Sequence, residues 1–415
     1  MGRGAKAERG VFFHLHPRRM VRQKPDFTSS KPTRISCGDG TAGTGRHVYF
    51  ENTDVPPMSR FALCLLALLL SACTDAPAEP GTSSPDPPPE SLTTVSSAER
   101  MQGVTLDARR TPPPTTLPEI AALGATHVTV IPFGFQRRTD DPAFRTNYDA
   151  DWYTEGDRGI RALARDAALL GMNLVLKPQV WIGNHDAEQW SANIGFDTED
   201  AWQTWEAQYR DFALHYARLS AEIDAPLFVI GTELGRAVRE REAFWRSLIA
   251  DVRAVYDGRL TYAANWYDDY EHVPFWDALD VIGIQAYFPL TEASAPTLAD
   301  LRAGWEAHEA PIEALHRRTG KPVLFTELGY RDVPHAAARP WEWPDRHTPA
   351  VEADPALQAR LFEAFFAEVW PEPWMAGAIL WKWHPPGDRD RTGDFTPQGK
   401  PAEAVIREAF TTPNP

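Results

Sequence analysis

A regular alternation of short apolar strands and helical segments, from residue 102 to about residue 410, is the feature that most constrains the fold. The runs predicted as strands are 103–106, 127–133, 173–178, 227–233, 260–264, 281–287, 322–328 and 377–381. Parallel strands need crossover connections, which are usually helices, so the alternation is typical of an α/β protein. Eight such strands favour a single (β/α)8 TIM barrel after a disordered N-terminal region. A doubly wound open sheet is the alternative, although no glycine-rich phosphate loop follows the first strand.

The segments between the strands have helical periodicity. The longest of them carries large apolar residues at spacings of three and four, which places these residues on one helical face. They are Trp202, Trp205, Tyr209, Phe212, Tyr216 and Leu219. Further helices are predicted over 117–123, 159–170 and 244–255.

The N-terminal part of the chain differs from the rest. Residues 1–57 are basic and rich in Arg, Pro and Gly, and we expect a non-native or disordered extension ahead of a start at Met58. Residues 58–72 read as a signal peptide, since ten apolar residues follow Arg60 and cannot span a bilayer, which needs about twenty. The residues Leu70-Ser71-Ala72-Cys73 resemble the bacterial lipobox, which implies lipidation of Cys73.

Charge and cysteine content limit the class of protein further. The formal charge is −15, and residues 1–72 carry a net +6, so the chain from Cys73 onward has −21. This charge argues against nucleic-acid binding and disfavours anionic substrates. We expect an exported monomer without disulfides, anchored by lipid in the cell envelope, because Cys37 and Cys64 precede the predicted cleavage site. A Pro/Ser/Thr-rich linker over 73–98 would join the anchor to a barrel domain over 99–412.

Polar and aromatic residues collect at the carboxyl ends of the predicted strands, where a barrel of this kind holds its site. They are Lys177, Trp181, Thr232, Glu233, Asn265, Trp266, Tyr287, Glu327, Trp381 and Lys382. No group of His, Cys and Asp residues has the spacing of metal ligands, so neither a metal nor another cofactor is expected. No Gly-x-Ser-x-Gly motif is present for a serine nucleophile.

Two of these residues are glutamates that end buried strands, Glu233 on the fourth and Glu327 on the seventh. A pair of carboxyl groups flanking one bond is the usual equipment for glycoside cleavage. One must remain ionised as a nucleophile, and the other must remain protonated near neutral pH, so their surroundings must differ. Each glutamate alone could instead form a strand-end salt bridge or a helix cap.

Glutamates at the ends of strands four and seven are the mark of the clan A glycoside hydrolases, and the chain most resembles family 113, the endo-β-1,4-mannanases. The resemblance rests on Leu174–Pro178, Ile230–Leu234, Leu279–Leu290 and Lys321–Tyr330. It implies a retaining enzyme in which Glu233 is the acid/base and Glu327 the nucleophile. It also implies that Tyr287 hydrogen-bonds the nucleophile and that Trp381 lies under the sugar at the cleavage point. Thr232 departs from the wider clan, where Asn precedes the acid/base.

The substrate expected from these residues is a neutral β-1,4-linked glycan, mannan or glucomannan first. The indoles of Trp181, Trp266 and Trp381 can stack on pyranose rings, while Lys177 and Asn265 can donate hydrogen bonds to hydroxyls. Two alternatives stay open at the level of sequence. One is an exo-acting β-glycosidase, since the long loops 132–152 and 331–354 could close one end of a cleft or flank an open one. The other is a non-catalytic glycan-binding surface lipoprotein.

The lipobox resemblance predicts that cleavage before Cys73 leaves this residue with a lipid anchor. Expression in a bacterial host with a labelled fatty acid should label the unmodified chain, which should fractionate with membranes. The Cys73→Ala chain should carry no label, because it lacks the thiol to be acylated. Equal labelling of the two chains would refute the prediction.

Overall fold

The computed structural model describes residues 93–412 apart from 97–98, 184–188, 344–351 and 388–391. The predicted extension, the signal peptide, Cys73 and most of the predicted linker lie outside the described residues. Val95, near the end of that linker, donates its backbone N–H to the carbonyl of Pro373 at 2.9 Å. No helix among the described residues is long and apolar enough to cross a membrane.

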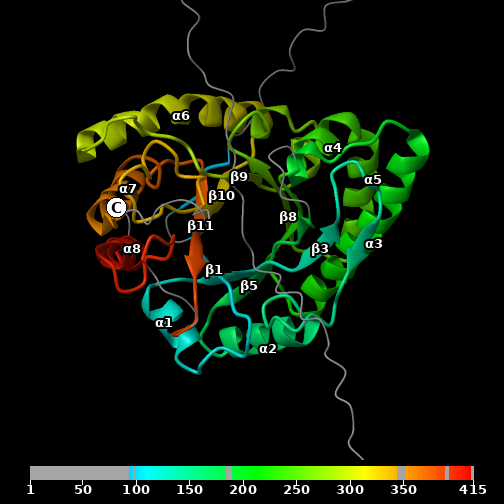
Figure 1. Cartoon of the computed structure of the whole chain (residues 1–415), viewed down its shortest axis with the longest axis horizontal. Helices are drawn as coiled ribbons and strands as arrows, with labels where there is room; N and C mark the ends of the chain where they lie inside the picture. Colours follow the sequence, from blue (N-terminus) through cyan, green and yellow to red (C-terminus); the bar gives the residue numbers. More distant parts are fainter. Residues whose placement is uncertain (1–92, 97–98, 184–188, 344–351, 388–391, 413–415) are drawn as a thin grey trace, which may run out of the picture. The chain divides into compact units, whose positions relative to one another are not determined.

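Eight parallel strands form a closed barrel, which confirms the predicted (β/α)8 TIM barrel (Figure 1). In spatial order they are β1 (Met101–Leu106), β11 (Met375–Trp383), β10 (Val323–Leu328), β9 (Ile282–Gln285), β8 (Arg259–Asn265), β7 (Leu227–Thr232), β5 (Asn173–Leu176) and β2 (His127–Val130). β1 pairs with both β2 and β11, so the first and last strands of the barrel are hydrogen-bonded neighbours and the barrel is closed. Closure brings all eight carboxyl ends to one rim, where the predicted site residues were placed.

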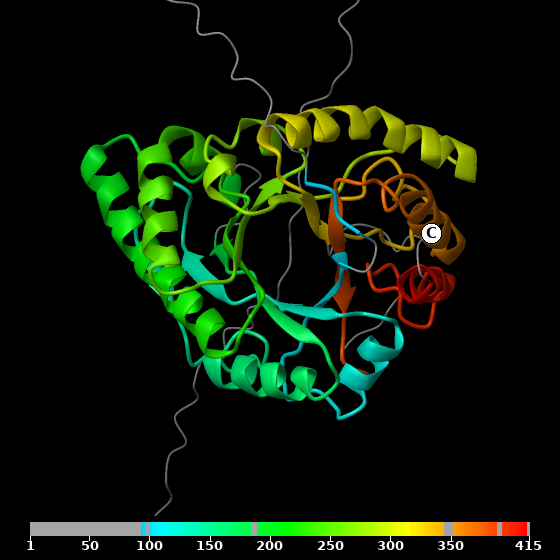
Figure 2. The same cartoon turned by 180° about the vertical axis from the view of Figure 1, so that it is seen from behind.

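Helices surround the barrel as an outer layer (Figure 2). They are α1 (Thr116–Ala122), α2 (Asp157–Ala168), α3 (Glu199–Glu222), α4 (Gly235–Glu240), α5 (Glu242–Arg253), α6 (Leu298–Thr319), α7 (Pro355–Glu368) and α8 (Pro401–Thr411). The six large residues predicted to share one face of α3 are all buried, which confirms the predicted apolar face of this helix. Trp205 stacks on Tyr209 at 4.8 Å, and the Tyr209 hydroxyl donates to the carbonyl of Ile230 on β7 at 2.9 Å.

Two predicted strands are shorter than expected and continue into a small second sheet. β2 ends at Val130 and β5 at Leu176, each just ahead of a proline, Pro132 or Pro178, that has no N–H for a strand ladder. The chain then resumes as β3 (Phe133–Gln136) and β6 (Gln179–Ile182), which pair in parallel, while β4 (Phe144–Thr146) pairs antiparallel to β3. The predicted loop 132–152 therefore contains a hairpin that extends the rim beside β2 and β5.

The barrel interior has an apolar layer drawn almost entirely from its own strands. Its members are Met101, Val175, Leu227, Val229, Ala263, Val281, Leu324, Ala376 and Ile379. Next along the strands come polar residues that are equally buried, among them Lys177, Gln285, Thr326 and Glu327. Buried polar groups need partners, so this second layer has to be a connected network.

Candidate active site

The backbone of β10 turns Glu327 into the barrel. Leu324 belongs to the interior layer, whereas Phe325 faces outward and stacks on Trp305 of α6 at 6.0 Å. Strict alternation would point Thr326 inward and Glu327 outward. The pairing with β9 shifts register between Phe325 and Glu327, so both Thr326 and Glu327 make contacts inside the barrel. Such bulges redirect single side chains, and here one brings a carboxylate to the rim.

Three donors converge on the Glu327 carboxylate, which is 3% exposed. The Tyr287 hydroxyl donates to Oε2 at 2.6 Å, the Lys177 ammonium pairs with Oε1, and the Gln179 amide donates to Oε1 at 3.3 Å. Lys177 also donates to Gln285 Oε1 at 3.0 Å. A cation and several donors around one carboxylate favour its ionised form.

Burial shifts the pKa of both ionisable partners of Glu327, Lys177 and Tyr287. It lowers the pKa of Lys177, while the charges of Glu327 and Glu233 act in the opposite direction. It raises the pKa of Tyr287 well above the ordinary value, and the neighbouring Glu327 adds to that rise. Tyr287 is therefore a neutral donor at physiological pH. Lys177 is fully buried and directed at Glu327, so its position indicates a role toward that carboxylate besides the predicted contact with sugar hydroxyls.

Glu233 occupies a constrained backbone position directly after β7. Its φ is +51°, in the left-handed region that residues other than glycine rarely enter. The pairing of β7 with β8 shifts register between Val229 and Thr232, and the Glu233 N–H donates to the carbonyl of Ala263 at 2.9 Å. Its Oε1 accepts a hydrogen bond from the Asn265 amide at 3.0 Å. An unfavourable backbone conformation held by the surrounding structure is typical of functional residues.

Asp269, which was not predicted from the sequence, holds the backbone of Asn265 by a hydrogen bond. Its Oδ2 accepts the backbone N–H of Asn265 at 2.9 Å and the Tyr262 hydroxyl at 3.3 Å. Burial raises the pKa of Asp269 to about 6, although the Asn265 N–H opposes the rise. Asp269 follows the strand end by four residues, in a loop, so inspection of strand ends could not find it.

Aromatic residues line the rim beside the carboxylates. Ile131, Tyr287, Trp381 and Phe395 form a buried cluster, against which Phe133, Trp266, Trp341 and Trp343 pack while partly exposed. Trp266 stacks on Trp341 at 5.3 Å, and Trp181 on β6 packs edge-on against Phe133 at 5.8 Å. Trp341 and Trp343 belong to the predicted loop 331–354. Two tryptophans so close together in one loop were the sequence signal that could have predicted its part in lining the rim.

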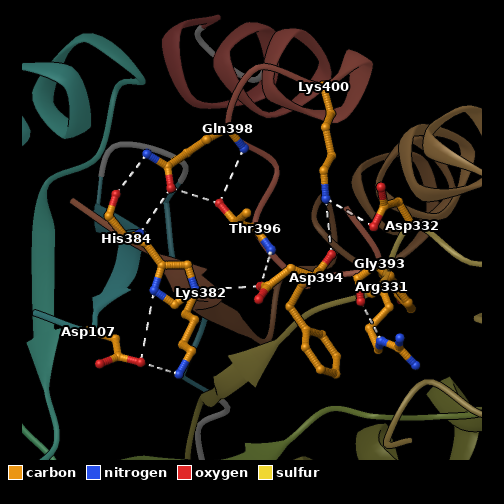
Figure 3. Close-up of polar contacts among 12 residues, drawn as sticks. Asp107, Arg331, Asp332, Lys382, His384, Gly393, Asp394, Thr396, Gln398 and Lys400 are labelled. Atoms are coloured by element: carbon orange, nitrogen blue, oxygen red, sulfur yellow. Dashed lines mark hydrogen bonds and ion pairs between the residues drawn. The ribbon is translucent and has the colours of Figure 1, made fainter. Parts of the chain in front are cut away.

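A second buried lysine lies beside Trp381. Lys382 Nζ pairs with Asp107 Oδ2 at 2.5 Å (Figure 3). It also lies 4.8 Å from the centre of the Trp381 ring. Asp107 directly follows β1, so an inspection of all eight strand ends would have included it. Thr232, next to Glu233, donates its hydroxyl to the carbonyl of Pro178 at 3.3 Å. Among the described residues no group of three or more His, Cys, Asp and Glu could hold a metal ion.

The structure thus brings together most of the residues selected from the sequence: Lys177 and Tyr287 at Glu327, Asn265 at Glu233, and Trp381 beside both lysines. The model of glycoside hydrolase family 113 matches residues 111–394. The chain belongs to this family. It is therefore a glycoside hydrolase, and retention of configuration through a double displacement is characteristic of the clan.

Solved structures agree with this assignment. The GH113 β-mannanase AaManA from Alicyclobacillus acidocaldarius, solved in complex with ManMIm, is 30% identical with a TM-score of 0.62, covering 77% of this chain and 99% of its own. Two structures of GH113 β-1,4-mannanase, one of them a complex, are each 26% identical, with TM-scores of 0.63 and 0.64. Each covers 76% of this chain and 99% of its own. A comparison with curated proteins gives no match.

The pairing of Lys177 with Glu327 predicts a pH-dependent loss of stability in Lys177→Met. Without its cation, the buried carboxylate is an uncompensated charge at neutral pH, whereas at low pH it can take up a proton and lose that charge. The destabilisation should therefore grow as pH rises. At neutral pH we expect a loss of about 3–5 kcal/mol, and a smaller one near pH 4.5. Urea unfolding at the two pH values measures both.

The control is Lys382→Met, which removes a buried lysine from a different carboxylate. Adding Glu327→Gln should restore stability to Lys177→Met at neutral pH, because it removes the uncompensated charge, but not to Lys382→Met. A loss in Lys177→Met that Glu327→Gln does not reduce would contradict the pairing.

Proposed function

We propose that the protein is an endo-β-1,4-mannanase that cleaves mannan or glucomannan with retention of configuration. The observation that carries the proposal is the difference between its two strand-end glutamates. Glu327 meets a cation and a phenol, whereas Glu233 accepts a hydrogen bond from the neutral amide of Asn265. The first setting suits a permanently ionised nucleophile, and the second suits a group that exchanges a proton during the reaction.

In the first step, the Glu327 carboxylate attacks the anomeric carbon while the bond to the leaving sugar breaks. Glu233 gives its proton to the leaving oxygen, which departs as a hydroxyl. In the second step, Glu233, now a carboxylate, takes a proton from water, whose oxygen attacks the anomeric carbon and releases Glu327. Two inversions at one carbon restore its original configuration.

The surrounding residues have distinct parts in this proposal. Tyr287 and Lys177 stabilise the Glu327 carboxylate before attack and as it leaves the glycosyl intermediate. Asn265 orients Glu233, and Asp269 holds the backbone of Asn265. Trp381 lies under the sugar at the cleavage point, next to Tyr287 in the buried cluster. Trp266 and Trp181 supply further flat surfaces for neighbouring sugar units.

Mannan is the proposed substrate because the similar solved structures are named as β-mannanases and β-1,4-mannanases. The acidic chain, with −15 overall, would repel uronic or sulfated polymers. Thr232 stands where the wider clan has an asparagine, so the site should also accept glucose units, as in glucomannan. We further propose that the enzyme acts in the cell envelope as a lipid-anchored monomer.

Hydrolysis of a panel of polysaccharides tests the substrate. With EDTA present, the full chain should shorten mannan and glucomannan to oligosaccharides from the earliest time points and leave xylan intact. EDTA should not reduce the rate, because the proposed reaction uses two carboxyl groups alone. Activity on cellulose or xylan without activity on mannan would contradict the proposed substrate. Early release of monosaccharide alone would instead identify an exo-acting enzyme.

Substitution of each glutamate tests the division of roles. Glu327→Ala should lose activity on every substrate, by about 10⁴-fold or more, and azide should restore turnover to a product of inverted configuration. Glu233→Ala should retain the first step on aryl glycosides with good leaving groups, because these need no acid. Proton NMR of the initial product anomer reads the first outcome, and the burst of released aryl alcohol reads the second. The reverse pattern would exchange the two roles, and an inverted product from the unmodified enzyme would reject the mechanism.

A further inference from the structure

The segment between β11 and α8 carries one aromatic residue, Phe395, into the site. Its side chain is 1% exposed, although the residue belongs to a loop. The ring lies edge-on to Tyr287, with centroids 6.1 Å apart at 72°, and 4.9 Å from the ring of Trp343. Tyr287 is one of the three donors to Glu327, so Phe395 packs against a side chain that contacts the carboxylate.

The end of β10 accommodates this ring closely. A Cβ placed on Gly329 would lie 2.4 Å from the carbonyl oxygen of Trp381 and 3.3 Å from Cδ1 of Phe395. A side chain at position 329 would therefore push β11 and Phe395 away. Phe395 therefore lies beside Gly329, two residues beyond Glu327, as well as against the ring of Tyr287.

A buried amide joins the same two segments. Gln358 of α7 is fully buried, and its Nε2 donates to the carbonyl of Tyr330 at 2.8 Å and to that of Phe395 at 3.2 Å. One side chain thereby fixes the Phe395 backbone relative to the strand end that carries Glu327. Buried backbone carbonyls need such partners, so the amide also makes burial of this loop possible.

Polar contacts anchor the described residues on either side of Phe395 (Figure 3). Arg331 Nε donates to the Gly393 carbonyl at 2.7 Å, and Lys400 Nζ lies 3.0 Å from Asp332 Oδ1. Gln398 accepts from the backbone N–H of His384 and donates to its carbonyl, each at 2.9 Å. Burial acts to raise the pKa of Asp394, but His384, whose Nε2 lies 3.5 Å from Oδ1, and the backbone N–H of Thr396, which donates to Oδ1 at 3.1 Å, hold the pKa below the ordinary value. The residues flanking Phe395 are thus tied to the segments that follow β10 and β11.

We propose that Phe395 is a positioning residue, which holds the Tyr287 ring so that its hydroxyl stays hydrogen-bonded to Glu327, with Gln358 and the loop anchors keeping Phe395 in place. The proposal rests on the proposed roles of Tyr287 and Glu327. The Tyr287–Glu327 hydrogen bond is short, at 2.6 Å, and charge-assisted bonds of this kind depend strongly on geometry. Loss of the aromatic edge would leave space for the Tyr287 ring to move and lengthen this bond.

The consequence is measurable at Glu327. The ionisable groups near it are Tyr287, Lys177 from the end of β5, and Glu233 from the end of β7. Phe395→Leu changes none of these groups but should weaken the hydrogen bond that Tyr287 donates to the carboxylate. A weaker donor makes the ionised carboxylate less favourable, so the acid limb of kcat/KM against pH should move upward by about one pH unit.

The chain contains a matched control. Phe362 of α7 is also buried and packs edge-on against a tyrosine, Tyr330, at 5.3 Å and 80°. Phe362→Leu and Phe395→Leu should each lower the Tm by about 2–4 °C, because each removes similar buried area. The acid limb should move in Phe395→Leu alone. If Phe395→Leu does not fold, Phe395→Met offers a flexible side chain that can fill the gap left by the ring, and it should move the limb in the same direction.

Two measurements on the full chain complete the test. Carbon-13 NMR of labelled Glu carboxyls, with Glu327 assigned from Glu327→Gln, follows its titration without any substrate. In a Tyr287→Phe background, Phe395→Leu should produce no further shift, because the hydroxyl it positions is absent. An unchanged Glu327 titration in Phe395→Leu, or an equal shift in both backgrounds, would overturn the proposal. A shifted titration in a chain that does not cleave mannan would contradict the proposed function alone.

Discussion

The buried contact of Glu327 with Lys177 and Tyr287 is the interaction on which the rest of the site depends. A carboxylate with 3% exposure is unfavourable unless a cation and hydrogen-bond donors compensate for lost water. The barrel brings Glu327 on β10 together with two partners that follow other strands, Lys177 after β5 and Tyr287 after β9. Because the partners come from different strands, the contact forms only when the barrel closes, so folding and assembly of the site are one event.

Register shifts explain how two neighbouring residues of β10, Thr326 and Glu327, can both make contacts inside the barrel. Register shifts in β7 and β10 occur just before Glu233 and Glu327. Each interrupts the alternation of side chains, and at Glu233 the backbone enters the left-handed region. Regular strands would build the apolar layer below, whereas irregular ends are needed to aim carboxyl groups at one point. The cost in local strain is offset by the packing of the strands beneath.

Much of this arrangement could be predicted from the sequence, for a physical reason. Apolar runs that end in a glutamate indicate both a buried strand and a polar strand end, so the barrel and the positions of Glu233, Asn265, Tyr287 and Glu327 followed from local pattern. Burial of Lys177 could not be predicted, because its partner is 150 residues away. Trp341, Trp343, Asp269 and Phe395 come from loops, whose paths depend on contacts such as those of Gln358 rather than on periodicity. The roles of the predicted residues and the lipid anchor stay predictions.

The most direct test of the central claim is covalent trapping of the nucleophile. A 2-deoxy-2-fluoro-β-mannosyl fluoride reacts in the first step, but the fluorine slows hydrolysis of the intermediate, so a glycosyl-enzyme should accumulate. Intact mass spectrometry should show one added glycosyl unit, and peptide sequencing should place it on Glu327. Label on another residue would contradict the account, as would an unlabelled enzyme that releases product of inverted configuration.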